Sequence, residues 1–219
     1  MTTEEMSVIE AIHSLRAVRR YKPDPVEPEK LTRVLRAGSM APSSGNVQPW
    51  EFVAVIAPEL KAKIKELILP AFEIFDTQAR TQTPEQLKDS SGRPVSGHWA
   101  VEQMDRTPVL ILVCYNPVRG RRFKDQWRWF EEHAGRGGSI FPAIQNMLLA
   151  AKALGLGTLL STLCVLRASE IKQLLHIPDH IGLEAMVHMG YPDEKLGRPK
   201  RLPLEQVAHL NEWETPYSA

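Results

Sequence analysis

The strongest constraint on the fold is one unbroken apolar run, Val109 to Tyr115, that directly follows Pro108. A strand that is apolar at every position has both faces buried, so we expect it in the centre of a sheet. The chain of 219 residues is long enough to bury a sizeable core, and no stretch of it has the composition of a linker. The sequence therefore predicts one domain, residues 1–219, built around this strand.

Apolar periodicity and capping residues predict the elements around this strand. Four helices are expected: 4–15 with Thr3 as its N-cap, one that begins at Pro28, 58–69, and one capped by Ser139 that ends at Gly155. A short helix is expected at 169–175, and strands at 51–56, 183–189 and after Gly157. Between 70 and 105 the pattern degrades, which predicts a variable surface excursion. Residues 116–138 carry aromatic side chains between glycine-containing stretches and are interpreted as a lid.

Charge and composition exclude several classes of function. Lys and Arg number 27 and Asp and Glu 26, so the net charge of +1 gives no field that favours nucleic acid or an anionic membrane. No apolar run reaches the roughly 18 residues of a membrane span, and the N-terminus lacks the pattern of a signal peptide. We therefore expect a soluble, cytoplasmic protein. Cys114 and Cys164 lie in apolar stretches and are interpreted as buried thiols.

Hydrolase and metalloenzyme motifs are missing from the sequence. It contains no Gly-x-Ser-x-Gly elbow, no Walker A loop and no His-Glu-x-x-His helix. His176 and His180 have the spacing of a metal-binding pair, but Pro178 between them disfavours a shared helical face. No metal site is therefore predicted.

The segment from Pro42 to Trp50 has the composition of a binding loop. Two prolines remove backbone donors, and Ser43, Ser44, Asn46 and Gln48 offer small polar groups where a ligand can approach. The alternative is an ordinary connection between a helix and a strand, whose polar residues satisfy only their own backbone.

Two basic clusters are candidates for binding a phosphate. Arg16, Arg19 and Arg20 place three guanidinium groups within five residues, and a tail from 195 to 201 holds Lys195, Arg198, Lys200 and Arg201. Arginine suits bidentate contact with phosphate, although a basic cluster taken alone is more often a solvated surface.

The order of several motifs resembles the nitroreductase family of FMN-dependent oxidoreductases. These motifs are Pro-Ser-Ser-Gly-Asn-x-Gln-Pro-Trp-x-Phe at 42–52, the helix from Gln145 with its Gly-Leu-Gly-Thr turn at 155–158, Gly-Tyr-Pro at 190–192, and Arg-x-Pro-Leu-Glu at 201–205. The family motif Arg-Arg-Ser-x-Arg corresponds to 15–19, where Leu15 replaces the first Arg and Ala17 replaces Ser.

The resemblance implies an α+β fold with a mixed or antiparallel central sheet wrapped by helices, in an intertwined homodimer that binds FMN at the subunit interface. The loop Pro42–Asn46 of one subunit and Arg16, Arg19 and Arg201 of the other would share one cofactor. The full set of cofactor-binding residues that it implies is Arg16, Ala17, Arg19, Arg20, Pro42, Ser43, Ser44, Asn46, Gln48, Ser139, Thr162, Leu163, Arg198 and Arg201.

The implied activity is the reduction of nitroaromatics, quinones or related planar, electron-poor acceptors by NAD(P)H, in a ping-pong reaction through flavin N5. No side chain is required as an acid or a base. Trp129 and Phe130 in the lid are the substrate-contacting candidates. Alternatives within the same fold are reductive dehalogenation and flavin fragmentation, and a non-catalytic flavin-binding or storage protein is the alternative from another class. The sequence does not decide between NADH and NADPH.

Overall fold

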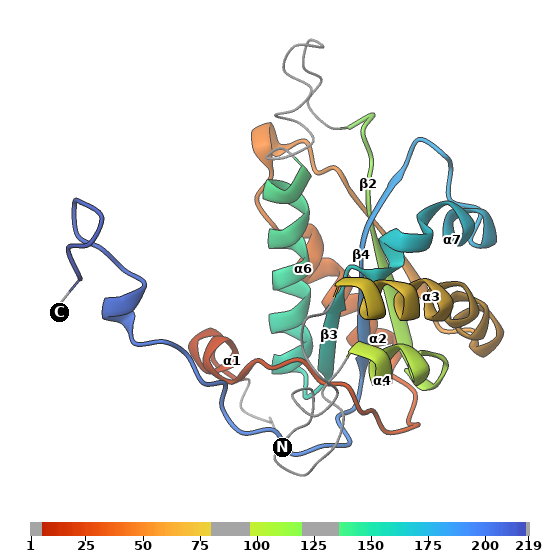
Figure 1. Ribbon diagram of the computed structural model, residues 1–219, viewed down its shortest axis with the longest axis horizontal. Coiled ribbons are helices and arrows are strands. Elements are labelled where there is room, and N and C mark those ends of the chain that lie inside the picture. Colours follow the sequence, from red (N-terminus) through yellow and green to blue (C-terminus); the bar gives the residue numbers. More distant parts are fainter. Residues whose placement is uncertain (1–5, 80–96, 120–135, 218–219) are drawn as a thin grey trace.

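The computed structural model describes residues 6–79, 97–119 and 136–217. Its centre is a four-stranded sheet in which every neighbouring pair of strands is antiparallel (Figure 1). The order across the sheet is β1-β2-β4-β3. The strands are β1 (Trp50–Val55), β2 (Val109–Tyr115), β3 (Gly157–Ser161) and β4 (Gly182–Gly190). Of the two sheet types that the family resemblance left open, the structure has the antiparallel one.

Helices cover both faces of this sheet (Figure 1). The α-helices are α1 (Val8–Ser14), α2 (Pro28–Ser39), α3 (Pro58–Ala79), α4 (Gly97–Glu102), α6 (Arg136–Ala153) and α7 (Ala168–Leu174). The short 3-10 helices are η1 (Ser44–Asn46), η3 (Met104–Arg106), η6 (Leu163–Arg167) and η7 (Leu204–Gln206). Helices α2 and α6 pack on one face, and α3, α4 and α7 pack on the other.

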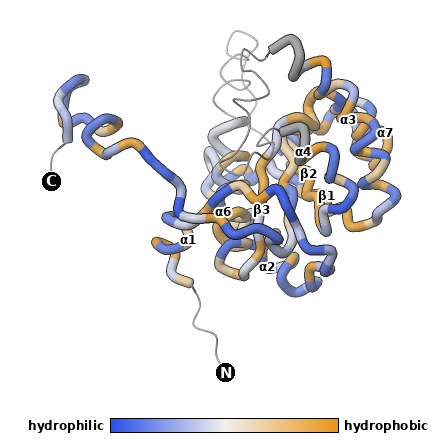
Figure 2. The backbone as a smooth tube through the Cα atoms, turned by 60° about the horizontal axis from the view of Figure 1, so that its bottom comes forward, coloured by the Kyte–Doolittle hydropathy of each residue, from blue (hydrophilic) through white to orange (hydrophobic). Residues whose placement is uncertain are grey.

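All seven residues of β2 are buried, which confirms that this strand is central. Its side chains alternate between the two cores: Val109, Ile111 and Val113 pack toward α2 and α6, whereas Leu110 and Leu112 pack toward α3 and α7. In Figure 2 the strands of the body are accordingly among its most hydrophobic segments. The two-sided apolar pattern thus produces three layers, helix on sheet on helix.

The prediction that the third helix ends before Pro70 is wrong. Helix α3 continues through Pro70 to Ala79. Phe72, in the turn after the proline, is 1% exposed and packs in one core with Ile64 and Ile68. Burial of this large side chain offsets the hydrogen bond that a proline removes from a helix interior. The first ten residues of the expected excursion, 70–79, are therefore part of a regular helix. Its residues 80–96 lie outside the described part.

Two predicted helix caps are also wrong. Helix α1 begins at Val8, and the side chain of Ser7 accepts the amide hydrogen of Glu10 at 3.2 Å, so Ser7 takes the role assigned to Thr3. Helix α6 begins at Arg136, so Ser139 is a buried residue of its first turn rather than its cap. The predicted end of α6 is correct: Gly155 has a φ of +77°, and Leu156 N donates to Ala151 O at 2.9 Å, as in a Schellman motif.

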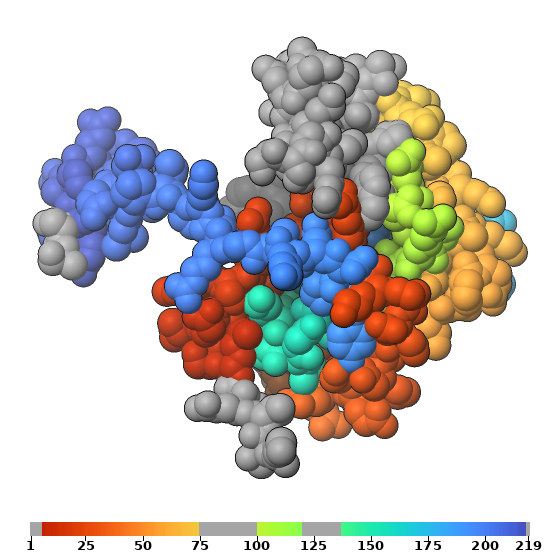
Figure 3. Space-filling view, turned by 90° about the horizontal axis from the view of Figure 1, so that it is seen from below, coloured from red at the N-terminus to blue at the C-terminus, as the bar shows by residue number. Residues whose placement is uncertain are grey.

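The last described residues form an arm that leaves the body (Figures 1 and 3). The arm, residues 202–217, closes on itself through hydrogen bonds from Tyr217 N to Ala208 O at 2.9 Å and from Leu210 N to Thr215 O at 2.8 Å. Its large apolar side chains are exposed, and Trp213 is 80% accessible. Within the described ranges, no helix combines the length and the apolar character that a membrane crossing requires.

Candidate functional site

The segment that carries the arginines lies along the outer edge of β3. Val18 N donates to Thr158 O at 2.8 Å, and Ala17 pairs with Thr158 as a parallel bridge. The contact is so close that a Cβ added to Gly157 would lie 2.6 Å from the Val18 side chain. Glycine at 157 is therefore what allows the arginine segment to reach the sheet.

The residues after β4 hold the other side of this segment. Lys22 N donates to Tyr191 O at 2.9 Å, and Asp193 N donates to Arg20 O at 2.9 Å. Between these two contacts, Tyr21 pairs with Pro192 as an antiparallel bridge. The backbone of 17–22 is thus fixed from both sides before any ligand is considered.

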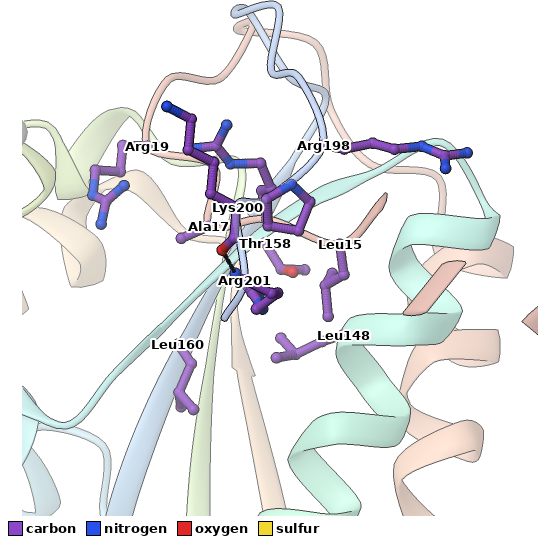
Figure 4. A pocket seen from close by; sticks show the side chains of 11 residues that line it. Leu15, Ala17, Arg19, Leu148, Thr158, Leu160, Arg198, Lys200 and Arg201 are labelled. Atoms are coloured by element: carbon purple, nitrogen blue, oxygen red, sulfur yellow. Dashed lines mark hydrogen bonds between the residues drawn. The ribbon is translucent and has the colours of Figure 1, made fainter. Parts of the chain in front are cut away.

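A cavity of about 700 Å³ opens between this segment and the basic tail. It has a cationic part and an apolar part. Figure 4 shows Arg19 and Arg198 on opposite sides of the cavity, with Lys200 and Arg201 between them. The lining residues are Leu15, Arg16, Ala17, Arg19, Leu148, Thr158, Leu160, Arg198, Pro199, Lys200 and Arg201. Five of these eleven residues are cationic and none is acidic, so the cavity suits a ligand that joins an anionic group to an apolar body.

The cations of the cavity differ in their partners. Arg16 Nη1 donates to Gly197 O at 3.3 Å, Arg198 Nη2 pairs with Glu10 Oε2 at 2.9 Å, and Arg201 Nη1 donates to Lys200 O at 2.9 Å. Arg19 Nε is buried and has no hydrogen-bond partner among the described residues. A buried donor of a charged group without a partner is costly.

The structure brings Arg16, Ala17, Arg19, Arg198 and Arg201 of the predicted set together in this cavity. Sequence reasoning missed Leu15, Leu148, Thr158, Leu160 and Pro199 as lining residues. A signal for two of them was present, because alternate residues of a strand share a face, so the expected strand after Gly157 places Thr158 and Leu160 on one side. Leu148 comes from α6, and no local pattern distinguishes it from the other apolar residues of that helix.

The loop from Pro42 to Gln48 has an unusual backbone. Gly45, Asn46 and Gln48 have φ values of +62°, +54° and +48°, and two of these residues are not glycine. Ser43 Oγ accepts the amide hydrogen of Gln48 at 3.0 Å, and Asn46 N donates to Ser43 O at 2.9 Å, so the loop is held by its own polar groups. Such strain is common in loops with a binding function.

This loop and the cavity lie at opposite ends of the sheet. Trp50, at the start of β1, pairs with Tyr115, which pairs with Gly182 at the start of β4, whereas Gly157 pairs with Gly190 at its end. Strand β4 has nine residues, which at about 3.3 Å per residue extend roughly 26 Å. Within one chain, the loop therefore does not reach a ligand in the cavity.

The remaining predicted site residues lie elsewhere. Thr162 and Leu163 follow β3 directly, two and three residues beyond Leu160, and neither lines the cavity. Arg20 and Ser139 do not line it either. Trp129 and Phe130 lie outside the described residues. The assignments of all these residues stay predictions.

The described start of the 116–138 segment is anchored beside the loop. Asn116 N donates to Pro49 O at 2.6 Å, and Asn116 Nδ2 donates to Glu51 Oε1 at 3.0 Å. Arg119 contacts the same carboxylate and donates to Trp50 O at 3.0 Å. The root of the predicted lid thus lies at the loop end of the sheet.

Among the described residues, the cysteines and the possible metal ligands form no second reactive site. Burial raises the pKa of Cys114 and of Cys164 to about 12, so both thiols are protonated and inert at neutral pH. Across the part of the chain that the structure describes, no group of three or more His, Cys, Asp or Glu side chains is arranged to hold a metal ion. The cavity is therefore the feature that any proposal for this chain has to explain.

Comparison with known proteins identifies the class. The model of the nitroreductase family matches residues 12–191, so the chain belongs to this family. Membership supports an oxidoreductase.

Individual relatives of the chain are distant. It is 27% identical over 202 residues to an NADH dehydrogenase of Thermus thermophilus, with 88% of this chain and 90% of that protein covered. It is 28% identical over 212 residues to iodotyrosine deiodinase 1 of Rattus norvegicus, with 94% and 70% covered. A crystal structure of oxidized iodotyrosine deiodinase bound to FMN and 3-iodo-L-tyrosine superposes with a TM-score of 0.74 at 24% identity, covering 94% of this chain and all of that one. This last likeness shows the fold.

Proposed function

We propose that the protein is an FMN-dependent NAD(P)H oxidoreductase that reduces planar, electron-poor acceptors such as nitroaromatics and quinones. The observation that carries the proposal is the cavity beside β3, whose lining combines five cationic residues with three leucines. A phosphate group at the cationic part would find charged donors on Arg16, Arg19 and Arg201, which suit bidentate contact with it. The leucines would exclude water beside the ribityl chain and the flavin ring.

In this proposal Arg16, Arg19 and Arg201 hold the FMN phosphate, with Arg198 beside them. The family's first Arg and its Ser are replaced by Leu15 and Ala17. Two features of the cavity support compensation for these changes. Lys200 adds a cation on the side of the tail, and Thr158, directly opposite Ala17 in the bridge, adds a hydroxyl (Figure 4).

A second copy of the chain completes the proposed site. The loop Pro42–Gln48 lies at the far end of the sheet from the cavity of its own chain, so a cofactor touched by both requires two subunits. Exposed apolar side chains on α1 and on the arm support a dimer, since Ile9 and Trp213 are 60% and 80% accessible. The apolar stripe of α6 lies mostly in the core of its own chain, and Phe141 is its exposed member.

When bound, FMN supplies two-electron chemistry, since its N5 takes a hydride from NAD(P)H and the reduced flavin passes the electrons to an acceptor. The chain's own residues bind and orient the cofactor, and no side chain is needed as an acid or a base. We assign Thr162 or Leu163, just beyond the leucine side of the cavity, to a polar contact near N5. Trp129 and Phe130 are assigned to the acceptor, which the anchoring of Asn116 and Arg119 beside the loop supports. A cytoplasmic location, expected from the sequence, belongs to the same proposal.

The direct test of this site is FMN affinity. Arg16→Ala and Arg201→Ala should each weaken FMN binding to the apoprotein by about 1.5–3 kcal/mol, the usual value of a charged hydrogen bond. A matched control is Arg167→Ala, because Arg167 pairs with Glu170 beside α7 and does not line the cavity. FMN affinity within twofold of wild type in both cavity variants would refute the site. Steady oxidation of NAD(P)H with a nitroaromatic would exclude a non-catalytic storage protein.

Reductive dehalogenation is the second candidate, because the identity to the rat iodotyrosine deiodinase is as high as that to the Thermus thermophilus NADH dehydrogenase. The two activities are distinguished by mixing the reduced enzyme with each substrate and measuring the products. We expect turnover of nitroaromatics and quinones, and no release of iodide from 3-iodotyrosine. Iodide release at a comparable rate would reverse the ranking. Fragmentation of the flavin when the reduced enzyme meets oxygen would instead assign the protein to the flavin-fragmenting branch of the family.

A further inference from the structure

The Glu194 side chain holds the arginine segment by its backbone. Its Oε1 accepts the amide hydrogen of Arg19 at 2.7 Å and that of Arg20 at 3.3 Å. Glu194 lies four residues after the end of β4 and 174 positions from Arg20 in the chain. In Figure 3 the N-terminal segment and the residues that follow β4 lie side by side across this face of the molecule.

The position of this carboxylate is unexpected. Glu194 is next to a cavity whose five cationic residues suit an anion, and a negative charge there opposes anion binding. The usual role of a carboxylate among arginines is to form an ion pair with a guanidinium group. Here the bonds of Oε1 go to main-chain amides instead, and Arg19 lines the cavity with its buried Nε lacking a partner among the described residues.

The two amide bonds fix a part of the segment that the sheet does not hold. Val18 and Lys22 bond to β3 and to Tyr191 through their backbones, and Glu194 anchors Arg19 and Arg20 between these two points. Tyr21 OH donates to Val18 O at 2.7 Å, and burial together with the nearby Glu194 charge raises the pKa of Tyr21, so this donor stays protonated. These hydrogen bonds together hold the backbone that carries Arg19 and Arg20.

We propose that Glu194 is a positioning residue for the anion-binding end of the cavity, acting through the amides of Arg19 and Arg20 to hold Arg19 where its side chain can take part in phosphate binding. This role rests on the proposed FMN site. A positioning role differs from a general structural role in one testable way. The acceptor oxygen of Glu194 should favour phosphate binding, whereas the negative charge of the same carboxylate should oppose it.

Two substitutions separate the oxygen from the charge. Glu194→Gln keeps a carbonyl oxygen where Oε1 lies and removes the charge, and Glu194→Ala removes both. FMN and riboflavin, which differ only in the phosphate, are titrated into the apoprotein of each variant and followed by flavin fluorescence. Glu170→Ala is the control, since Glu170 pairs with Arg167 away from the cavity. If Glu194→Ala is too unstable to titrate, Glu194→Asp, whose oxygen is one methylene short, takes its place.

We expect Glu194→Ala to weaken FMN binding by about tenfold or more, the loss that one or two charge-assisted hydrogen bonds produce. Riboflavin affinity should stay within about twofold of wild type, and Glu194→Gln should bind FMN at least as tightly as wild type does. An equal loss for both flavins, or no loss for either in Glu194→Ala, would overturn the positioning role. A wild-type protein that binds FMN no better than riboflavin would instead contradict the proposed phosphate site, and the role with it.

Discussion

Replacing Arg19 with Met should change the stability of the protein and its affinity for FMN in opposite directions. Arg19 Nε is buried without a partner among the described residues, and an unpaired buried donor costs about 1–3 kcal/mol. Met has a similar length and no polar hydrogen, so it removes this cost from the FMN-free protein. The unfolding temperature of the apoprotein should therefore rise, by about 2–4 °C for each kcal/mol in a chain of this size.

The same substitution should weaken FMN binding, because it removes a charged contact worth about 1.5–3 kcal/mol, which corresponds to about 10-fold to 150-fold in affinity. Thermal unfolding of the apoprotein and fluorescence titration with FMN measure the two effects. Arg16→Met is the matched comparison: Arg16 already donates to Gly197 O, so its replacement should weaken FMN without stabilising the apoprotein. An Arg19→Met apoprotein that is less stable than wild type, or that binds FMN equally well, would refute the reasoning.

Three further predictions test the surroundings of the site. Gly157→Ala places a Cβ 2.6 Å from the Val18 side chain, so it should destabilise the protein by about 1–3 kcal/mol and weaken FMN binding. Val18→Gly in the same chain should recover part of both losses, because it removes the Val18 Cβ at 2.8 Å as well as the two methyl groups. Burial lowers the pKa of His188 from its ordinary 6.5 to about 4, so the native state binds fewer protons than the unfolded state between these values. Denaturant unfolding should therefore show stability falling from about pH 6.5 to about pH 4, and His188→Gln should flatten that fall. Thr158→Val should weaken FMN about twofold to tenfold, the value of one neutral hydrogen bond, and Ala17→Ser should recover part of the loss.

Each of these predictions has a contrary outcome. Failure of Val18→Gly to recover any of the loss in Gly157→Ala would mean that the close approach of the arginine segment is not what glycine permits. If His188→Gln leaves the fall in unfolding free energy between about pH 6.5 and about pH 4 unchanged, other titrating groups cause that fall. A Thr158→Val variant with wild-type FMN affinity would remove its hydroxyl from the proposed contacts.

Elements whose signal is local were predictable from the sequence. The run from Val109 to Tyr115 needs no partner to indicate a buried strand, and Pro28 at a first turn with periodic leucines indicates helix α2. Gly155 similarly ends α6 because the αL conformation that it adopts favours glycine. The buried cysteines follow from apolar surroundings alone.

Features that depend on tertiary contacts were not predictable. Helix α3 passes Pro70 because Phe72 reaches the core, and no local preference reveals that. The cavity joins residues 15–19, α6, β3 and the tail. Its cations belong to the two basic clusters of the sequence, whereas its apolar lining residues were not predicted. The contact between Glu194 and Arg19 spans 175 positions, and a Glu beside a Pro and an Asp carries no sign of it. Long-range pairing of this kind is set by the sheet register, which a single sequence does not contain.

The reduction of bound flavin tests the central claim most directly. Purified protein is reconstituted with FMN, freed of excess cofactor and titrated with NADH and with NADPH in the absence of oxygen, while its visible spectrum is recorded. The account predicts that FMN stays with the protein, that at least one nicotinamide bleaches its visible absorption, and that a nitroaromatic or a quinone then restores it. A protein that retains no FMN, or whose bound FMN neither nicotinamide bleaches, would contradict the proposed function.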